Sequence, residues 1–340
     1  MTSALSPGEA DTSTGEPRSG CPHPAADRRP LFSARDYISG GIFVLERCSL
    51  CGLVLTTPQP PPDEIGKYYP RGYYGQGKRY SLPLERLLDW LYAFRTRLIE
   101  IANGLEPGRV LDIGCGRGLL LHHLRKRGWE VAGTELSEDS ASYARDVLHI
   151  DVQTANITDL RLPSESFDAV ILWHVLEHIT DPEALLQEVA RILYPGGTLL
   201  VAVPNFGSVE ARLAKSRWFH LDVPRHLNHF TPQTLRRMLD EAGLHPRMVS
   251  YFASEYDFFS FVQTAENMLG IRHNTLYNLL RTRGAKVLAG RHPDPTSPAD
   301  IAAALLLAPV LAAISLVWAP LAALLGQGAT VTMYAKKPRR

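Results

Sequence analysis

One stretch of the chain alternates apolar and polar positions in the order strand, turn, helix and strand. Residues 110–113 form a short apolar run, residues 119–127 repeat apolar side chains at a helical period, and residues 130–134 alternate as a strand. The turn between the first two elements has glycine at every second position, which leaves backbone N–H groups open to a ligand at a helix N-terminus. The pattern predicts the first βαβ unit of a doubly wound α/β sheet.

The apolar pattern near the C-terminus is of a different kind. Residues 301–326 contain no charged side chain and are long enough to cross a bilayer. Residues 327–340 then alternate as a strand and end in a basic tail. A strand cannot lie across a bilayer from its own sheet, so we do not expect a true span. Pro309 and Pro320 are expected to break the segment into pieces too short to span alone.

We therefore expect a helical insertion over residues 261–326 that ends in a kinked helix or a helical hairpin. A stripe of small residues should pack on the protein, with the leucines on other faces. In one alternative the leucines enter one leaflet, with Trp318 at the interface and the basic tail near lipid headgroups. In the other, they are buried in the core or in a dimer contact. The stripe comprises Ala304, Ala308, Ala312, Ser315, Ala319, Ala322 and Gly326, and the tail carries Lys336, Lys337, Arg339 and Arg340.

Composition and charge narrow the class of protein. The 340 residues are 45% hydrophobic and 21% charged, which suits one or two globular domains. A net charge of +1 gives no field for nucleic acid, so we expect no nucleic-acid partner. Residues 1–20 are rich in Ser, Thr, Gly and Pro, and we expect a disordered tail there. No secretory signal pattern is present, so we expect a cytoplasmic protein, at the inner face of the membrane if the leucines enter lipid.

The spacing of the glycine turn indicates its ligand. A dinucleotide fingerprint, G-x-G-x-x-G, would need glycine at position 119, where this chain has Leu119. The turn instead reads D-x-G-x-G-x-G, from Asp112 through Gly114 and Gly116 to Gly118. Asp112 thus offers a carboxylate that suits a cation rather than a pyrophosphate. The spacing disfavours a nicotinamide-dependent oxidoreductase, which we keep as a rival function.

This motif resembles motif I of the class I S-adenosylmethionine-dependent methyltransferases. Residues 167–205 resemble the fourth strand, helix, proline-glycine turn and fifth strand of that family. The resemblance covers residues 80–260 and 327–338 and implies a Rossmann-like sheet of seven strands. It also implies that Glu135 holds the ribose hydroxyls of the cofactor and that an adenine lies near Asn156. The cofactor-binding residues that it implies are Asp112, Gly114, Cys115, Gly116, Gly118, Glu135, Leu136, Asn156, Ile157, Trp173 and His178.

Two histidine-rich segments are candidates for the chemistry. His174 and His178 follow the fourth strand, at the carboxyl edge where open α/β sheets bind ligands. His226 lies among the four histidine and aspartate residues of a second segment, which in relatives walls the acceptor pocket, and we select it as general base. The alternatives are that His178 only packs against the cofactor and that the second segment only closes a loop. Some ubiquinone-type O-methyltransferases recruit a divalent ion through E-x-x-E-H, but His174 replaces the first Glu here, so we do not predict that ion.

The cysteines near the N-terminus have the spacing of a metal site. Cys48 and Cys51 form C-x-x-C-G, the pattern of a zinc knuckle. Upstream, Pro24 stands where a partner cysteine is expected, so only Cys21 and His23 could complete the site. The segment resembles the front modules of relatives that carry two C-x-x-C pairs. Bound structural zinc and a metal-free remnant held by its β-hairpin both stay open as interpretations.

The sequence as a whole predicts an S-adenosylmethionine-dependent methyltransferase that acts on the O or C atom of a small or lipid-linked acceptor. A non-catalytic scaffold that binds the cofactor is the alternative from outside the enzymes. The expected divisions are the tail, a zinc-ribbon-like module with its linker, the cofactor domain, the helical insertion, and the last strand with the basic tail. Their bounds are residues 1–20, 21–75, 80–260, 261–326 and 327–340.

Overall fold

The computed structural model describes residue 21 and residues 23–61, 64–69, 82–104, 106–282 and 296–339. The predicted disordered tail, the linker after residue 69 and Arg340 lie outside these residues.

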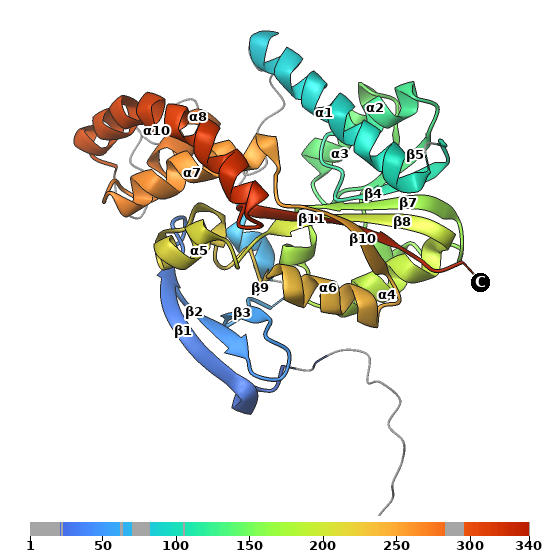
Figure 1. The fold of residues 1–340 in the computed structure, drawn as a ribbon, viewed down its shortest axis with the longest axis horizontal. Helices are drawn as coiled ribbons and strands as arrows, with labels where there is room; N and C mark the ends of the chain where they lie inside the picture. Colours follow the sequence, from blue (N-terminus) through green and yellow to red (C-terminus); the bar gives the residue numbers. More distant parts are fainter. Residues whose placement is uncertain are drawn as a thin grey trace, which may run out of the picture.

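A seven-stranded sheet forms the centre of the fold (Figure 1). Its strand order is β10-β11-β8-β7-β4-β5-β6, in which β4 to β8 pair in parallel and β11 lies antiparallel between β10 and β8. This confirms the predicted Rossmann-like sheet and its last strand. The strands are β4 (Arg109–Ile113), β5 (Glu130–Thr134), β6 (Asp151–Gln153), β7 (Phe167–Trp173), β8 (Leu193–Pro204), β10 (His245–Ser250) and β11 (Thr330–Lys336).

Helices cover both faces of this sheet. In Figure 1, α1, α2 and α3 lie on one face, and α4 and α6 lie on the other. The central strands are mostly apolar because both faces are buried: in β7, Val170 and Leu172 belong to one core, and Ala169 and Ile171 to the other. The helices are α1 (Leu82–Asn103), α2 (Leu119–Lys126), α3 (Glu138–Asp146), α4 (Pro182–Ile192) and α6 (Pro232–Glu241).

The N-terminal module forms a second, antiparallel sheet that includes a strand from the later part of the chain, β9. β1 (Arg28–Arg35), β2 (Ile42–Cys48) and β3 (Val54–Thr57) are followed across the sheet by β9 (Asn228–His229). A buried ion pair between Arg225 Nη2 and Asp36 Oδ1, 2.8 Å long, joins the same two parts of the chain. The N-terminal module and the histidine-rich segment therefore share one sheet and a buried ion pair.

The helical insertion consists of α7 (Ser254–Met268), α8 (Thr275–Thr282) and α10 (Pro298–Leu324). The expected break at Pro309 and Pro320 was wrong, because α10 runs through both prolines as one helix. A proline in a helix costs about 3 kcal/mol. Packing of the flanking turns against α7 and α8 offsets this cost, since Ala304 and Leu311 lie in a shared core with Val262 of α7.

Most leucines of α10 do not enter the protein core. The buried side of the helix carries mainly the small residues of the predicted stripe, at Ala304, Ser315, Ala319 and Ala322, whereas Ala312 is exposed and Leu311 is buried instead. The opposite side is exposed and apolar: Leu305, Leu306, Val310, Ile314, Leu316, Val317, Leu321 and Leu324. Of the helices in the described residues, α10 alone has both the length and the apolar character of a membrane span.

The basic tail does not accompany α10. Lys336 Nζ donates to the Gly196 carbonyl at 3.0 Å, and Lys337 Nζ donates to the Leu193 carbonyl at 2.8 Å. β11 leads away from α10, so α10 and the basic tail lie at opposite ends of this strand (Figure 1). The arrangement therefore gives no support to the predicted pairing of the tail with lipid headgroups beside α10.

Candidate active site

The glycine turn lies between β4 and α2, at the carboxyl edge of the parallel strands. Its three glycines have positive φ, +72° at Gly114, +54° at Gly116 and +70° at Gly118. A Cβ at Gly114 would lie 2.6 Å from Val175, and one at Gly118 would lie 3.0 Å from Ala144. A Cβ at Gly116 would meet no atom of the described residues within 4 Å. Packing thus explains two of the glycines, and Gly116 keeps space open beside the turn for a ligand.

Asp112 and Arg95 place a carboxyl group and a guanidinium in the interior beside this turn. Asp112 is 4% exposed, and its Oδ1 atom has no hydrogen-bond partner among the described residues. Burial raises the pKa of Asp112 to about 8, although the Arg95 guanidinium opposes the shift. Arg95 itself lies over the Trp173 ring, 3.4 Å from its centroid. Such a pair suits a zwitterionic amino-acid group, with its ammonium at Asp112 and its carboxylate at Arg95.

Glu135 follows β5 and reaches across to the turn. Its Oε2 accepts the Gly116 N–H at 2.9 Å, and its Oε1 accepts the Ser137 N–H at 2.8 Å. Each carboxylate oxygen keeps a further lone pair, so Glu135 could bind a ribose diol while it holds the turn. Its place beside Gly116 suits the predicted role, which stays a prediction.

The other predicted cofactor-binding residues differ in how exposed their side chains are to a ligand. Cys115 is half-buried in the turn, and the side chains of Leu136 and Asn156 are exposed at the same edge of the sheet. Ile157 is only 2% exposed and lies in the hydrophobic core. Ile157 could therefore contact an adenine only through its backbone.

A cavity of about 280 Å³ lies against the segment that follows β7. Ionisable side chains line one part of it, and aromatic side chains with one asparagine line the rest. The first group is His174, Glu177, His178, His220, Asp222 and His226, and the second is Tyr37, Phe219, Tyr256, Phe259, Asn274 and Tyr277. The three predicted catalytic histidines therefore meet in one pocket, although they come from two separate segments.

Burial keeps these histidines neutral. It lowers the pKa of His178 and of His226 to about 4, and that of His174 to about 3. The carboxylates of Asp222 and Glu177 oppose the shift at His226. A neutral imidazole can accept a proton, and these carboxylates would stabilise the imidazolium that forms.

Backbone contacts fix how two of the rings are turned. His178 Nδ1 lies 2.9 Å from the Arg225 carbonyl oxygen, and His226 Nδ1 lies 2.8 Å from the His220 carbonyl oxygen. A carbonyl only accepts, so Nδ1 of each neutral ring carries the hydrogen and Nε2 keeps a lone pair. The two rings lie edge to face, with centroids 4.7 Å apart. Both side chains are therefore oriented as proton acceptors.

Several buried polar atoms in this pocket have no hydrogen-bond partner among the described residues: His174 Nε2, Glu177 Oε2 and His220 Nε2. His174 Nδ1 contacts Glu177 Oε1 at 3.2 Å, and His174 has a φ of +54°, which is strained for a histidine. One ligand atom from each of Glu177, His178 and His226 lies within 4.8 Å of the others. Unpaired buried polar atoms and local strain both indicate a site for a polar ligand.

Several residues of the site were not found in the sequence, among them Arg95, Tyr256 and Tyr69. Arg95 is a buried arginine on α1, and its role depends on how α1 packs. Tyr256 of α7 lies with its ring centroid 4.3 Å from that of His174. The Tyr69 hydroxyl lies 3.1 Å from His178 Nδ1. Each is distant from the histidines in sequence, so no local motif indicates it.

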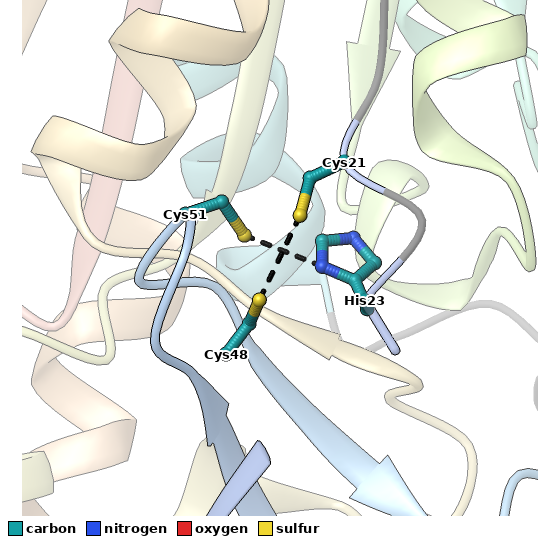
Figure 2. Close-up of side chains that lie close together, drawn as sticks. All are labelled: Cys21, His23, Cys48 and Cys51. Carbon is teal, nitrogen blue, oxygen red and sulfur yellow. Dashed lines mark hydrogen bonds between the residues drawn. The ribbon is translucent and has the colours of Figure 1, made fainter. Parts of the chain in front are cut away.

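The four predicted metal ligands also come together, apart from this cavity. Figure 2 shows the side chains of Cys21, His23, Cys48 and Cys51 pointing toward one another. Their ligand atoms all lie within 4.8 Å of one another. The structure thus confirms the grouping that the sequence predicted, including His23 at its C-x-H spacing.

The sheet order, the glycine turn and the pocket at the carboxyl edge define an α/β enzyme of the nucleoside-cofactor-binding type. A family model described as a methyltransferase domain matches residues 84–248. A ubiquinone biosynthesis O-methyltransferase of Alkalilimnicola ehrlichii is 37% identical over 205 residues, which are 58% of this chain and 78% of that protein. One of Idiomarina loihiensis is 35% identical over 158 residues, which are 42% of this chain and 63% of that protein.

The chain belongs to the class I S-adenosylmethionine-dependent methyltransferases. Its cofactor is S-adenosylmethionine, so the nicotinamide-dependent oxidoreductase is excluded. Among solved structures, a SAM dependent methyltransferase from Archaeoglobus fulgidus superposes with a TM-score of 0.46 at 19% identity, over 73% of this chain and 94% of that chain.

Proposed function

We propose that the protein methylates a hydroxyl oxygen of a lipid-linked acceptor, which enters the histidine pocket from a membrane surface. The observation that carries the proposal is the position of α7 between the pocket and the exposed apolar side of α10. Tyr256 and Phe259 of α7 line the pocket, and other α7 side chains, including Val262, pack in one core with α10. The named function of the two relatives, O-methylation in ubiquinone biosynthesis, supports this class of acceptor.

The chemistry of the pocket favours an oxygen nucleophile. S-adenosylmethionine supplies a methyl group on a sulfonium, so the protein has to align the acceptor and remove its proton. His226 Nε2 is the proton acceptor that we propose, because Asp222 and Glu177 would stabilise the resulting charge. His178, with its ring against His226, is oriented in the same way and would relay or share that proton. The aromatic side chains of Phe219, Tyr256 and Tyr277 would exclude water from the acceptor.

Transfer of a labelled methyl group identifies the acceptor class. The protein is incubated with methyl-labelled S-adenosylmethionine and either the membrane-lipid extract or the aqueous extract of cells that lack it. We expect label in a lipid product that mild acid and base leave intact, as an ether requires. The Gly116→Val protein serves as the inactive control. Label confined to water-soluble products would contradict a lipid-linked acceptor.

The exposed side of α10 gives a separate prediction. Leu306 and Val317, at 76% and 70% exposure, and Leu324, at 85%, are on the side proposed to enter lipid. Each buried leucine-sized side chain contributes about 1.5–3 kcal/mol, so replacing all three by Glu should lower vesicle binding by ~100-fold or more. Flotation with phospholipid vesicles measures this loss.

Leu213→Glu is the matched control, because Leu213 on α5 (Val209–Ala214) is 67% exposed but lies outside α10. We expect it to float like the wild type. Wild-type protein that stays in the soluble fraction without detergent would contradict the membrane proposal. If the wild type is a dimer and the triple variant is a monomer, the leucines form a dimer contact instead.

A further inference from the structure

The side-chain cluster in Figure 2 is built around a tight turn between β2 and β3. Cys48 ends β2, and its carbonyl accepts the Gly52 N–H at 2.8 Å, at a residue whose φ is +78°. Backbone N–H groups of Leu50 and Cys51 donate to the Cys48 sulfur. This is the arrangement of a metal-binding knuckle, in which backbone amides stabilise thiolates.

The distances within the cluster suit ligands of one ion and do not suit a disulfide. The Cys21 and Cys48 sulfurs lie 3.7 Å apart, whereas a disulfide requires about 2.05 Å. Two sulfurs bound to tetrahedral zinc at about 2.3 Å would be separated by about 3.8 Å. The Cys51 sulfur lies 3.3 Å from His23 Nδ1, close to the ~3.6 Å expected for a sulfur and a nitrogen on the same ion.

The ligand set also indicates which metal the cluster would bind. Three thiolates and one imidazole are the soft ligands that structural zinc takes in a closed tetrahedral site. Cys48 is fully buried and Cys51 nearly so, and Cys21 and His23 cover them from the other side. With four protein ligands no coordination position is left open, so the site would not be catalytic.

The position of the cluster gives the ion a structural role between two parts of the protein. The Cys21 N–H donates to Glu183 Oε1 of α4 at 3.0 Å, and Arg237 of α6 donates to the Cys51 carbonyl. β3 leads from this turn to Thr56, whose hydroxyl donates to the His226 carbonyl at 2.7 Å. The knuckle and the pocket wall are thus connected through a single short strand.

We propose that Cys21, His23, Cys48 and Cys51 bind one structural zinc ion, which fastens the N-terminal sheet to α4 and α6. The ion thereby supports β3 against the segment that carries His226. The proposal is independent of the acceptor and of methyl transfer, because metal content and folding stability test it directly.

Metal analysis of the full chain, purified without chelators after growth with zinc, tests the proposal. We expect one zinc per chain in the wild type and at least ~10-fold less in Cys48→Ser and in His23→Ala. Cys115→Ser is the matched control and should keep its zinc, since Cys115 lies outside the cluster. His23→Cys should also retain zinc, because it restores a fourth thiolate.

Two further measurements keep the test decisive if the variants fold poorly. Unfolded wild-type protein refolded with cobalt(II) should show the visible absorption of a tetrahedral thiolate site, and a chelator should lower the melting temperature of the zinc-loaded protein. A wild type that contains no zinc and gives no such cobalt spectrum would overturn the proposal. Zinc retained in Cys48→Ser would also overturn it.

Discussion

Replacement of Gly116 by valine is expected to abolish binding of S-adenosylmethionine. Gly116 has a φ of +54°, and the space beside its Cα holds no atom of the described residues within 4 Å. A branched side chain would occupy that space and shift the N–H that Glu135 now accepts. We expect the dissociation constant to rise roughly 100-fold or more, which corresponds to a loss of at least about 2.7 kcal/mol of binding free energy. Isothermal titration calorimetry measures it.

Gly243→Val separates loss of the cofactor space from backbone strain. Gly243 has a φ of +75° and equally open surroundings, but it follows α6, away from the glycine turn. A side chain at positive φ costs about 1–2 kcal/mol at either position, so both variants should lose similar stability. Only Gly116→Val should lose the cofactor. If Gly116→Val bound S-adenosylmethionine within threefold of the wild-type affinity, this turn would not be the binding site.

Removal of the His226 imidazole is expected to lower the turnover rate by ~10² or more while cofactor affinity stays unchanged. His226 is 8% exposed, and its Nδ1 contact with the His220 carbonyl points Nε2 as a proton acceptor. His226→Ala removes both nitrogens, so it also removes the contact that holds the loop. Single-turnover rates at saturating acceptor measure the chemical step.

The His226→Asn variant distinguishes a general base from a residue that only lines the pocket. The asparagine amide can still donate to the His220 carbonyl, but it has no group that replaces Nε2. If His226 is the base, the His226→Asn variant should turn over as slowly as His226→Ala. A loss of turnover rate smaller than tenfold would make His226 a positioning residue and leave His178 or His174 as the base. Turnover should also persist with a chelator that leaves the zinc of the cysteine cluster in place, whereas its loss under that condition would mean that Glu177, His178 and His226 hold a metal.

The conformation of the glycine turn could be predicted from the sequence, for a physical reason. A turn that needs positive φ at Gly114, Gly116 and Gly118 leaves a strong local signal, since few residues other than glycine adopt that conformation. The front cluster is similar, because a knuckle fixes its cysteine spacing locally. In both cases the local motif, Gly114 to Gly118 or Cys48 to Cys51, lies within a few residues of sequence, whereas Cys21 and His23 join the cysteine cluster from further away.

The parts that sequence could not supply depend on tertiary packing. Pro309 has an unfavourable effect on an isolated helix, but contacts of α10 with α7 and α8 override it. Arg95 reaches the cofactor site only because α1 lies over the sheet beside Trp173. Tyr256 and Phe259 of α7 and Tyr277 of α8 line the pocket, but no motif connects them with the histidines.

A structure of the protein with S-adenosylhomocysteine tests the central claim most directly. The account predicts the ribose at Glu135, the amino-acid group between Asp112 and Arg95, and the sulfur facing the cavity that His178 and His226 line. The ligand should also fill the space beside Gly116. A bound ligand whose sulfur faces away from the histidine cavity, or one that occupies another part of the sheet edge, would contradict the account.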